Sequence, residues 1–185
     1  HEDGGSILEN QLVEANPLME AFGNAKTIKN DNSSRFGKFI KLQFTGDGKI
    51  SGATVNSYLL EKSRVVWQAK NERSFHIFYQ LTEGAPQATR DKFQLGSAAD
   101  CGFLSNGKVV VESQPDKEEF EHTMTAMELM GINDFERDSI LGTVAAICHL
   151  GNVKFEAVGE TSEVANKDVL AKAAKCFECD AAQLD

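Results

Sequence analysis

The stretch GNAKTIKNDNSSRFGKF, from Gly23 to Phe39, decides how the rest of the chain is interpreted. It is polar, follows a segment with helical periodicity and precedes an alternating one, which predicts a loop between a helix and a strand. Its cations are Lys26, Lys29, Arg35 and Lys38, and its single acid is Asp31. Between the cations lie Asn30, Asn32, Ser33 and Ser34. Guanidinium and backbone N–H groups bind phosphate, and hard oxygens bind Mg2+. The loop therefore predicts a phosphate and magnesium site, against the alternative of a solvated turn.

Hydrophobic residues recur at helical spacing before this loop and at alternate positions after it. The helical pattern covers residues 7–15, and we expect Asn16-Pro17 to begin a separate helical turn, because proline suits the first helical position. Alternation over residues 40–44 indicates a half-buried strand, turn residues 46–48 follow it, and residues 50–58 form a weaker return strand. Together they predict a β-hairpin with one buried face.

The middle of the chain combines a short extended pattern with an aromatic helical one. Residues 64–68 are expected to form a third strand or an extended connection, with Trp67 as a packing anchor. A helix is predicted from Asn71 to a stop at Gly84-Ala85-Pro86, with aromatic side chains on its core face. We interpret His76, within this helix, and the later His149 as packed helix residues rather than ligands.

Polar residues at fixed offsets predict where the later helices begin. Asp116 and Glu119 have the spacing of a capping box, in which two side chains bond to the backbone at a helix start. Asn133 or Asp134 is expected to cap the next helix, and Asn166 the last one. The chain is therefore predicted to be mixed α/β, with more helix in its second half.

The composition is that of a globular protein segment and excludes several classes. The chain has 185 residues, 41% of them hydrophobic and 25% charged, with a net charge of −9. This length supports a real core. The negative charge argues against nonspecific nucleic-acid binding, and no apolar run approaches the length of a membrane span. Because the chain begins at His1 and shows no secretory signal, we expect a processed product or a fragment.

The cysteine pattern does not predict a metal site. Cys176 and Cys179 have ligand spacing, but no second pair exists, and they lie in a helical pattern, so reduced thiols are expected. Unpaired cysteines without a signal are typical of a reducing cytosol. The sequence also lacks a GxSxG nucleophile motif, an HExxH zinc motif and a P-loop.

Residues 30–38, NDNSSRFGK, closely resemble switch I of the myosin motor family. Kinesins share the shorter pattern NxxSSR, but there the arginine is typically followed by Ser-His, whereas Phe36-Gly37-Lys38 follows it here, as in myosins. Other runs resemble the family, in family order, over nearly the whole chain: Glu14–Pro17, Glu20–Thr27, Ser57–Val65, His76–Leu81 and Leu150–Phe155. The stretch 59–80 resembles conventional two-headed, class II myosins.

The resemblance implies a Mg2+ and ATP site with four ligand residues. Ser34 would give its hydroxyl to magnesium, and Asn30 would contact the phosphates. Ser33 would hold the γ-phosphate and orient the attacking water. Arg35 would pair with a glutamate of switch II, a segment that this sequence does not contain, so Ser33 and Arg35 are the predicted catalytic residues. Asp31 stands where myosins usually have Asn, and we expect this to alter the surface and keep the site.

The resemblance also implies a fragment of a P-loop NTPase-type α/β motor domain. Residues 1–44 would contain the end of loop 1, a helix, switch I and a strand of the central sheet. Residues 45–185 would form much of the upper half of the actin-binding cleft. The implied partners are the actin filament and the remaining motor segments, including the P-loop and switch II, with no nucleic acid and no membrane, in the cytoplasmic cytoskeleton.

Two alternatives remain open at this point. The first is a microtubule motor of kinesin type, which shares the short motif; Phe36-Gly37-Lys38 and the downstream runs count against it. The second is a non-catalytic module that binds actin or another protein through the cleft surface, and the missing P-loop favours it for the isolated chain. A GxxxxGK[ST] motif ahead of His1 in the full gene would discriminate between them.

Overall fold

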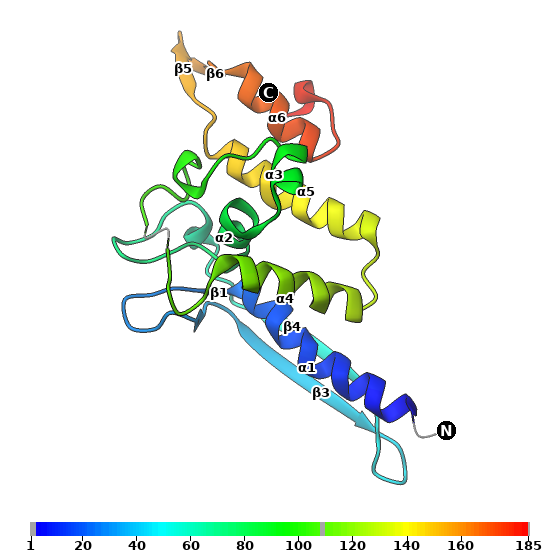
Figure 1. The fold of residues 1–185 in the computed structure, drawn as a ribbon. Coiled ribbons are helices and arrows are strands. Elements are labelled where there is room, and N and C mark those ends of the chain that lie inside the picture. The colour runs from blue at the N-terminus through cyan, green and yellow to red at the C-terminus, as the bar shows by residue number, and fades with distance from the viewer. Residues whose placement is uncertain (1–2, 108–109, 185) are drawn as a thin grey trace.

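The computed structural model describes residues 3–107 and 110–184, with side chains from residue 11 onward (Figure 1). The helices and strands are α1 (Asp3–Gly23), β1 (Asn24–Ala25), β2 (Ser33–Ser34), β3 (Gly37–Phe44), β4 (Ile50–Tyr58), α2 (His76–Tyr79), α3 (Gln87–Lys92), α4 (Asp116–Leu129), α5 (Asp134–Leu150), β5 (Phe155–Val158), β6 (Thr161–Val164) and α6 (Lys167–Cys176). Gln80–Gly84 extends α2 as a π-helix, and Lys62–Val65, Ala98–Asp100 and Ala181–Gln183 are 3-10 turns. Mixed helices and small sheets agree with the predicted α/β composition.

The molecule is elongated, with its three strand pairs kept apart. Among the described residues the antiparallel pairs are β1–β2, β3–β4 and β5–β6. Figure 1 shows α1 lying along the β3–β4 hairpin to form an arm, and β5, β6 and α6 at the opposite end. Helices α2, α4 and α5 lie between them, so the loop between β1 and β2 sits where the arm meets the helical body.

The core is built around the aromatic segment that the sequence predicted as a helix. Phe75, Phe78 and Tyr79 are buried against side chains of α4 and α5, including Phe120 and Leu141. The helix begins at His76, not at Asn71 as predicted. Phe75 is extended (φ −60°, ψ 145°) and forms a β-bridge with Ala25, and this pairing excludes a helix before it.

Tertiary packing overrides two other local predictions. Helix α1 begins at Asp3, within the stretch assigned to loop 1, and continues through Pro17 without the predicted break. Its C-terminal part packs on α2 and α4 with Ala21 buried, which offsets the hydrogen bond that proline removes. Residues 62–65 form a 3-10 turn instead of the predicted extended segment, and Trp67 is 64% exposed rather than a packing anchor.

Helix capping follows the sequence in one case and departs from it in another. Asn133 and Glu136 form a reciprocal capping box at the start of α5, as predicted for Asn133. The predicted Asp116–Glu119 box at α4 is absent, because Pro115 is the N-cap and the Asp116 carboxylate lies 2.5 Å from the Arg73 guanidinium. Asp116, which was predicted to cap the helix, instead forms an ion pair with the buried Arg73.

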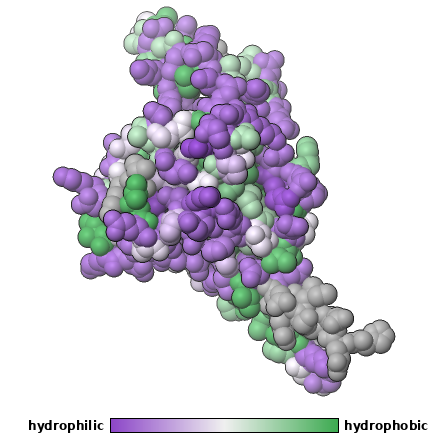
Figure 2. All heavy atoms as spheres, viewed as in Figure 1, coloured by the Kyte–Doolittle hydropathy of each residue, from purple (hydrophilic) through white to green (hydrophobic). Residues whose placement is uncertain are grey.

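The β3–β4 hairpin forms as predicted, with Gly37 opposite Tyr58 and a register shift at Gln43/Phe44. The predicted buried face is wrong within the described residues, because apolar side chains on both strands are exposed: Phe39, Ile40, Leu42, Phe44, Val55 and Tyr58. Figure 2 shows hydrophobic side chains along this arm. A contiguous group of exposed apolar side chains is typical of a surface that other protein segments cover.

Candidate functional site

The predicted ligand loop is closed by its own short strand pair. Asn24 lies opposite Ser34, and Ala25 opposite Ser33, in the β1–β2 ladder. Ala25 is also bridged to Phe75 of the core. The two ends of the loop formed by residues 26–32 therefore lie side by side, next to the core. The sequence predicted the loop but not this pair, since strands of two residues leave no periodic pattern.

Hydrogen bonds within the loop fix its backbone. The Thr27 N–H and hydroxyl both donate to the Asn30 carbonyl, at 2.8 and 3.1 Å. The Asn32 N–H donates to Asn30 Oδ1 at 2.8 Å, an Asx-type turn. With its oxygen used inside the loop, the exposed Asn30 side chain keeps its amide N–H groups as donors for a ligand.

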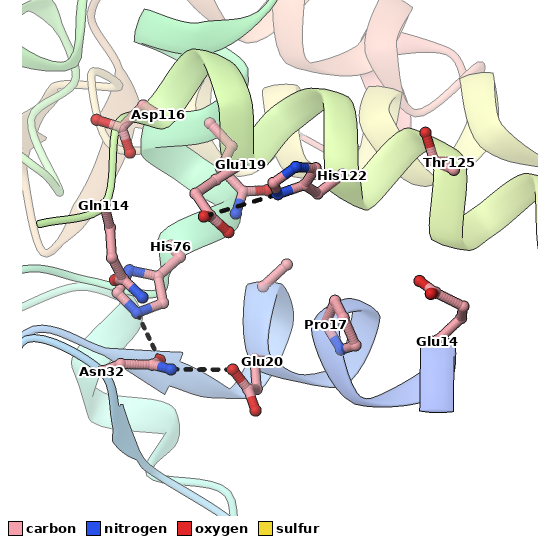
Figure 3. Close-up of a pocket in the computed structure, with 12 residues that line it drawn as sticks. Glu14, Pro17, Glu20, Asn32, His76, Gln114, Asp116, Glu119, His122 and Thr125 are labelled. Carbon is pink, nitrogen blue, oxygen red and sulfur yellow. Dashed lines mark hydrogen bonds and ion pairs between the residues drawn. The ribbon is translucent and has the colours of Figure 1, made fainter. Parts of the chain in front are cut away.

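Asn32 joins the loop to α1 and α2, a role that the sequence analysis did not assign. Its Nδ2 donates to Glu20 Oε2 at 2.9 Å, and its Oδ1 accepts from Asn24 Nδ2 at 3.0 Å and from His76 Nε2 at 3.1 Å. Figure 3 shows Asn32 and His76 meeting beside a cavity of about 490 Å3 between α1 and α4. Asn32 thus faces the protein, and this cavity is lined by none of the four predicted ligands.

The His76 imidazole is buried in its neutral form. Burial and the nearby Arg73 charge lower the pKa of His76 to about 4, and Asp31 opposes the decrease. At pH values between about 4 and 6.5, the His76 imidazole binds a proton in the unfolded segment but not in the folded one. Its contribution to stability is therefore complete above pH 6.5 and is lost as the pH falls toward 4.

This titration predicts a pH-dependent loosening of the loop's base. In the intact protein, the opening free energy of the amides at 76–81, from native-state hydrogen exchange corrected for intrinsic rates, should fall by up to about 3 kcal/mol between pH 6.5 and 4. His76→Gln should flatten this slope, because the amide does not titrate. His122→Gln, at an exposed imidazole on α4, is the control and should keep it. An unchanged slope in His76→Gln would assign the effect to other groups.

The two predicted serine ligands differ in their contacts. Ser34 donates its hydroxyl proton to the Phe36 carbonyl at 2.9 Å, which leaves its oxygen lone pairs unused. The Ser33 hydroxyl makes no hydrogen bond to any residue that the structure describes. Neighbouring side chains leave a strand on opposite faces, so the two hydroxyls point in different directions. The structure brings Asn30, Ser33 and Ser34 together on one short loop.

Arg35 has a partner within the chain that the sequence analysis did not predict. Its Nε lies 2.8 Å from Glu61 Oε2, and its carbonyl accepts the Glu61 N–H at 2.9 Å. The Nε–H does not point at that carboxylate, and among the described residues it has no hydrogen-bond acceptor although it is buried. The large majority of buried donors in proteins have an acceptor, either a protein group or an ordered water molecule.

Comparison with known proteins assigns the chain to a family. Residues 2–185 match the family described as "Myosin head (motor domain)". The chain belongs to the myosin head family. It is 46% identical to "Myosin-I heavy chain" of Dictyostelium discoideum over 186 residues, covering 97% of this chain and 8% of that protein. It is 53% identical to "Myosin heavy chain, non-muscle" of Drosophila melanogaster over 148 residues, 80% of this chain and 7% of that protein.

This myosin segment spans less than a tenth of the length of either relative. Membership of the family excludes the kinesin-type alternative. Because the two relatives carry different class names, the conventional two-headed class stays a prediction.

Asp31 is the position at which the sequence analysis expects a departure from the family, and the structure shows what its carboxylate contacts. It pairs with Lys26 Nζ and accepts the Ser113 hydroxyl at 2.6 Å, so it ties the loop to the segment before α4. Lys26 is thereby neutralised within the loop. The expectation that the change alters the surface and keeps the ligand positions remains a prediction.

Among the described residues, no group of histidine, cysteine, aspartate and glutamate could hold a metal ion, and no helix is long and apolar enough to cross a membrane. The four cysteines are free thiols. Cys176 ends α6 and Cys179 lies beyond it, so only Cys176 is helical.

Proposed function

We propose that this chain is part of an actin-based myosin motor that hydrolyses Mg-ATP, and that residues 30–38, at the end of the ligand loop, are its switch I. Membership of the myosin head family supports the motor. The observation that carries the site is one short loop with unused ligand groups, the Asn30 amide, the Ser33 hydroxyl and the Ser34 oxygen, followed by Arg35, whose buried Nε–H has no hydrogen-bond acceptor among the described residues.

The donor set fits a magnesium–nucleotide complex. A hydroxyl that donates its proton to a backbone carbonyl, as Ser34 does, offers its lone pairs to a hard cation. Bound Mg2+ would neutralise phosphate charge during phosphoryl transfer. Asn30 would donate its amide to the phosphates, and Ser33 would hold the γ-phosphate and position the attacking water. Arg35 would close the site by pairing with a switch II glutamate.

The exposed hairpin supports a place in a larger sheet. We infer that β3 belongs to the central sheet of the motor and that other segments of the head cover its exposed apolar side chains and Trp67. The proposed division after Phe44 falls at the end of β3, before the turn to β4. Residues 45–185 would then form much of the upper half of the actin-binding cleft, in the cytoplasmic cytoskeleton.

Removing one hydroxyl should separate the two serine roles. In the intact motor, we expect Ser34→Ala to raise the Mg2+ concentration for half-maximal ATPase about tenfold, because one oxygen ligand is lost. Ser33→Ala should instead slow the hydrolysis step and leave the magnesium requirement unchanged. Ser105→Ala is a matched control, since Ser105 also donates to a backbone carbonyl but lies outside the loop. A shifted magnesium requirement in Ser33→Ala alone would reverse the two assignments.

The remaining alternative, a non-catalytic binding module, is tested with the same intact motor. Actin-activated, Mg2+-dependent ATP hydrolysis that depends on Ser33 supports the proposed function. Binding to actin with no ATP turnover, and with no effect of Ser33→Ala, would support the module instead.

A further inference from the structure

A buried arginine outside the ligand loop is linked, through two glutamates, to both ends of that loop. Arg64 lies in the Lys62–Val65 turn, is 7% exposed and is not among the ligands proposed above. Its guanidinium uses all three nitrogens: Nε and Nη2 donate to Glu61 at 2.9 and 3.3 Å, and Nη1 donates to Glu72 Oε2 at 3.0 Å and to the Arg73 carbonyl at 3.2 Å.

Each carboxylate that Arg64 holds also contacts one end of the loop. Glu61 lies 2.8 Å from Arg35 Nε and donates its own N–H to the Arg35 carbonyl, at the C-terminal end. Glu72 Oε1 accepts the Ile28 N–H at 3.2 Å, near the N-terminal end. The Arg73 N–H donates to the Lys26 carbonyl at 3.0 Å on the same side.

The backbone of Arg64 is itself fixed, so its guanidinium has a defined position. Its carbonyl accepts Gln68 Nε2 at 2.8 Å and the Ser74 hydroxyl at 2.9 Å, and both of these residues are buried. Burial lowers the pKa of Arg64, but the bonds to Glu61 and Glu72 outweigh this and raise it. The charge is therefore present at every physiological pH.

We propose that Arg64 is a positioning residue for switch I: its guanidinium, through Glu61 and Glu72, holds the two ends of the 26–35 loop at a fixed separation. The functional part of this inference rests on the proposed function. A planar guanidinium can bind two carboxylates in different directions at once, whereas a lysine ammonium on a flexible stem cannot reproduce that geometry. Arg64 would thus keep Asn30, Ser33 and Ser34 in one arrangement without touching the nucleotide.

The geometry predicts which amides respond to which variant. In the intact motor without nucleotide, Arg64→Lys should increase hydrogen exchange at least tenfold across amides 27–36 and leave α5 unchanged. Glu72→Gln should increase it at 27–30 only, and Glu61→Gln at 33–36 only. Lys62→Ala, at an exposed cation in the same turn, is the control and should change neither. In the Glu61→Gln/Glu72→Gln background, Arg64→Lys should add little, because both of its links are already weakened.

The nucleotide measurement is kept separate from the exchange measurement. With Arg64→Lys we expect KM for ATP to rise about tenfold and kcat to change less, since the loop is less ordered before binding. If hydrogen exchange increases only in the loop while the ATP kinetics stay unchanged, the positioning role of Arg64 is supported. The function proposed for the loop is then contradicted. The positioning role would be overturned if hydrogen exchange increased equally in α5, or if each single glutamate variant affected both ends of the loop alike. The glutamate variants give this answer even if Arg64→Lys fails to fold.

Discussion

Arg35→Ala in the intact motor is expected to leave ATP binding largely unchanged and to slow hydrolysis by about 100-fold or more, the loss typical when a group that stabilises the transition state is removed. Arg35 directly follows Ser33 and Ser34, the proposed ligands, and its buried Nε–H has no hydrogen-bond acceptor among the described residues. An acceptor supplied by switch II would complete this bond only when the site closes. Single-turnover hydrolysis, measured separately from nucleotide binding, gives the result.

Two carboxylates compete as the functional partner of Arg35, and charge reversal distinguishes them. Exchanging Arg35 with the switch II glutamate, as Arg35→Glu with Glu→Arg at the partner, should recover part of the rate. Exchanging Arg35 with Glu61 should not, because Glu61→Arg would place a new cation against Arg64. If the hydrolysis rate recovers only in the Arg35→Glu/Glu61→Arg double variant, then the Arg35–Glu61 pair within this chain is the functional one. If neither double variant exceeds the product of the two single losses, Arg35 does not act through a pair.

The parts of the fold that the sequence predicted are those fixed by nearby residues. The β3–β4 hairpin follows from alternation on either side of a glycine turn, and the start of α5 follows from the local Asn133–Glu136 box. The site was predicted differently: the ligand loop was inferred from a residue pattern that resembles a family, and its ligand roles stay predictions. Its closure by β1 and β2 was not predicted, since strands of two residues leave no periodic pattern.

The missed features depend on residues distant in sequence or on segments outside this chain. Glu61 and Glu72 appear as ordinary surface acids in the sequence, and their role follows from a buried arginine between them. Trp67 has the size of a packing anchor but is exposed in this chain, and we infer that another part of the head covers it in the intact motor. The Asp116–Glu119 pattern failed because Arg73, far earlier in the chain, pairs with Asp116. No local pattern records such contacts.

That Arg73–Asp116 pair carries the largest expected effect on stability. Arg73 is fully buried, stacks 3.8 Å from the centre of the Tyr79 ring, and has two further nitrogens, Nε and Nη1, with no partner among the described residues. Burial raises the pKa of the Asp116 carboxyl, and Arg73 opposes the increase, so both charges are desolvated. Asp116→Ala should therefore lower the opening free energy of amides 76–81 and 118–127 by about 3–5 kcal/mol, because it leaves a buried cation unpaired.

The matched comparison is the exposed Lys92–Asp138 pair, whose atoms lie 2.6 Å apart. Asp138→Ala should cost about 0–1 kcal/mol, as expected for an ion pair in water. Adding Arg73→Met to Asp116→Ala should recover much of the loss, since an apolar side chain of similar length can pack against Tyr79 without an uncompensated charge. Native-state hydrogen exchange of the intact motor measures all three variants. If Asp116→Ala costs no more than Asp138→Ala, or if Arg73→Met worsens it, then the pair does not stabilise the junction between the core and α4 in the way argued here.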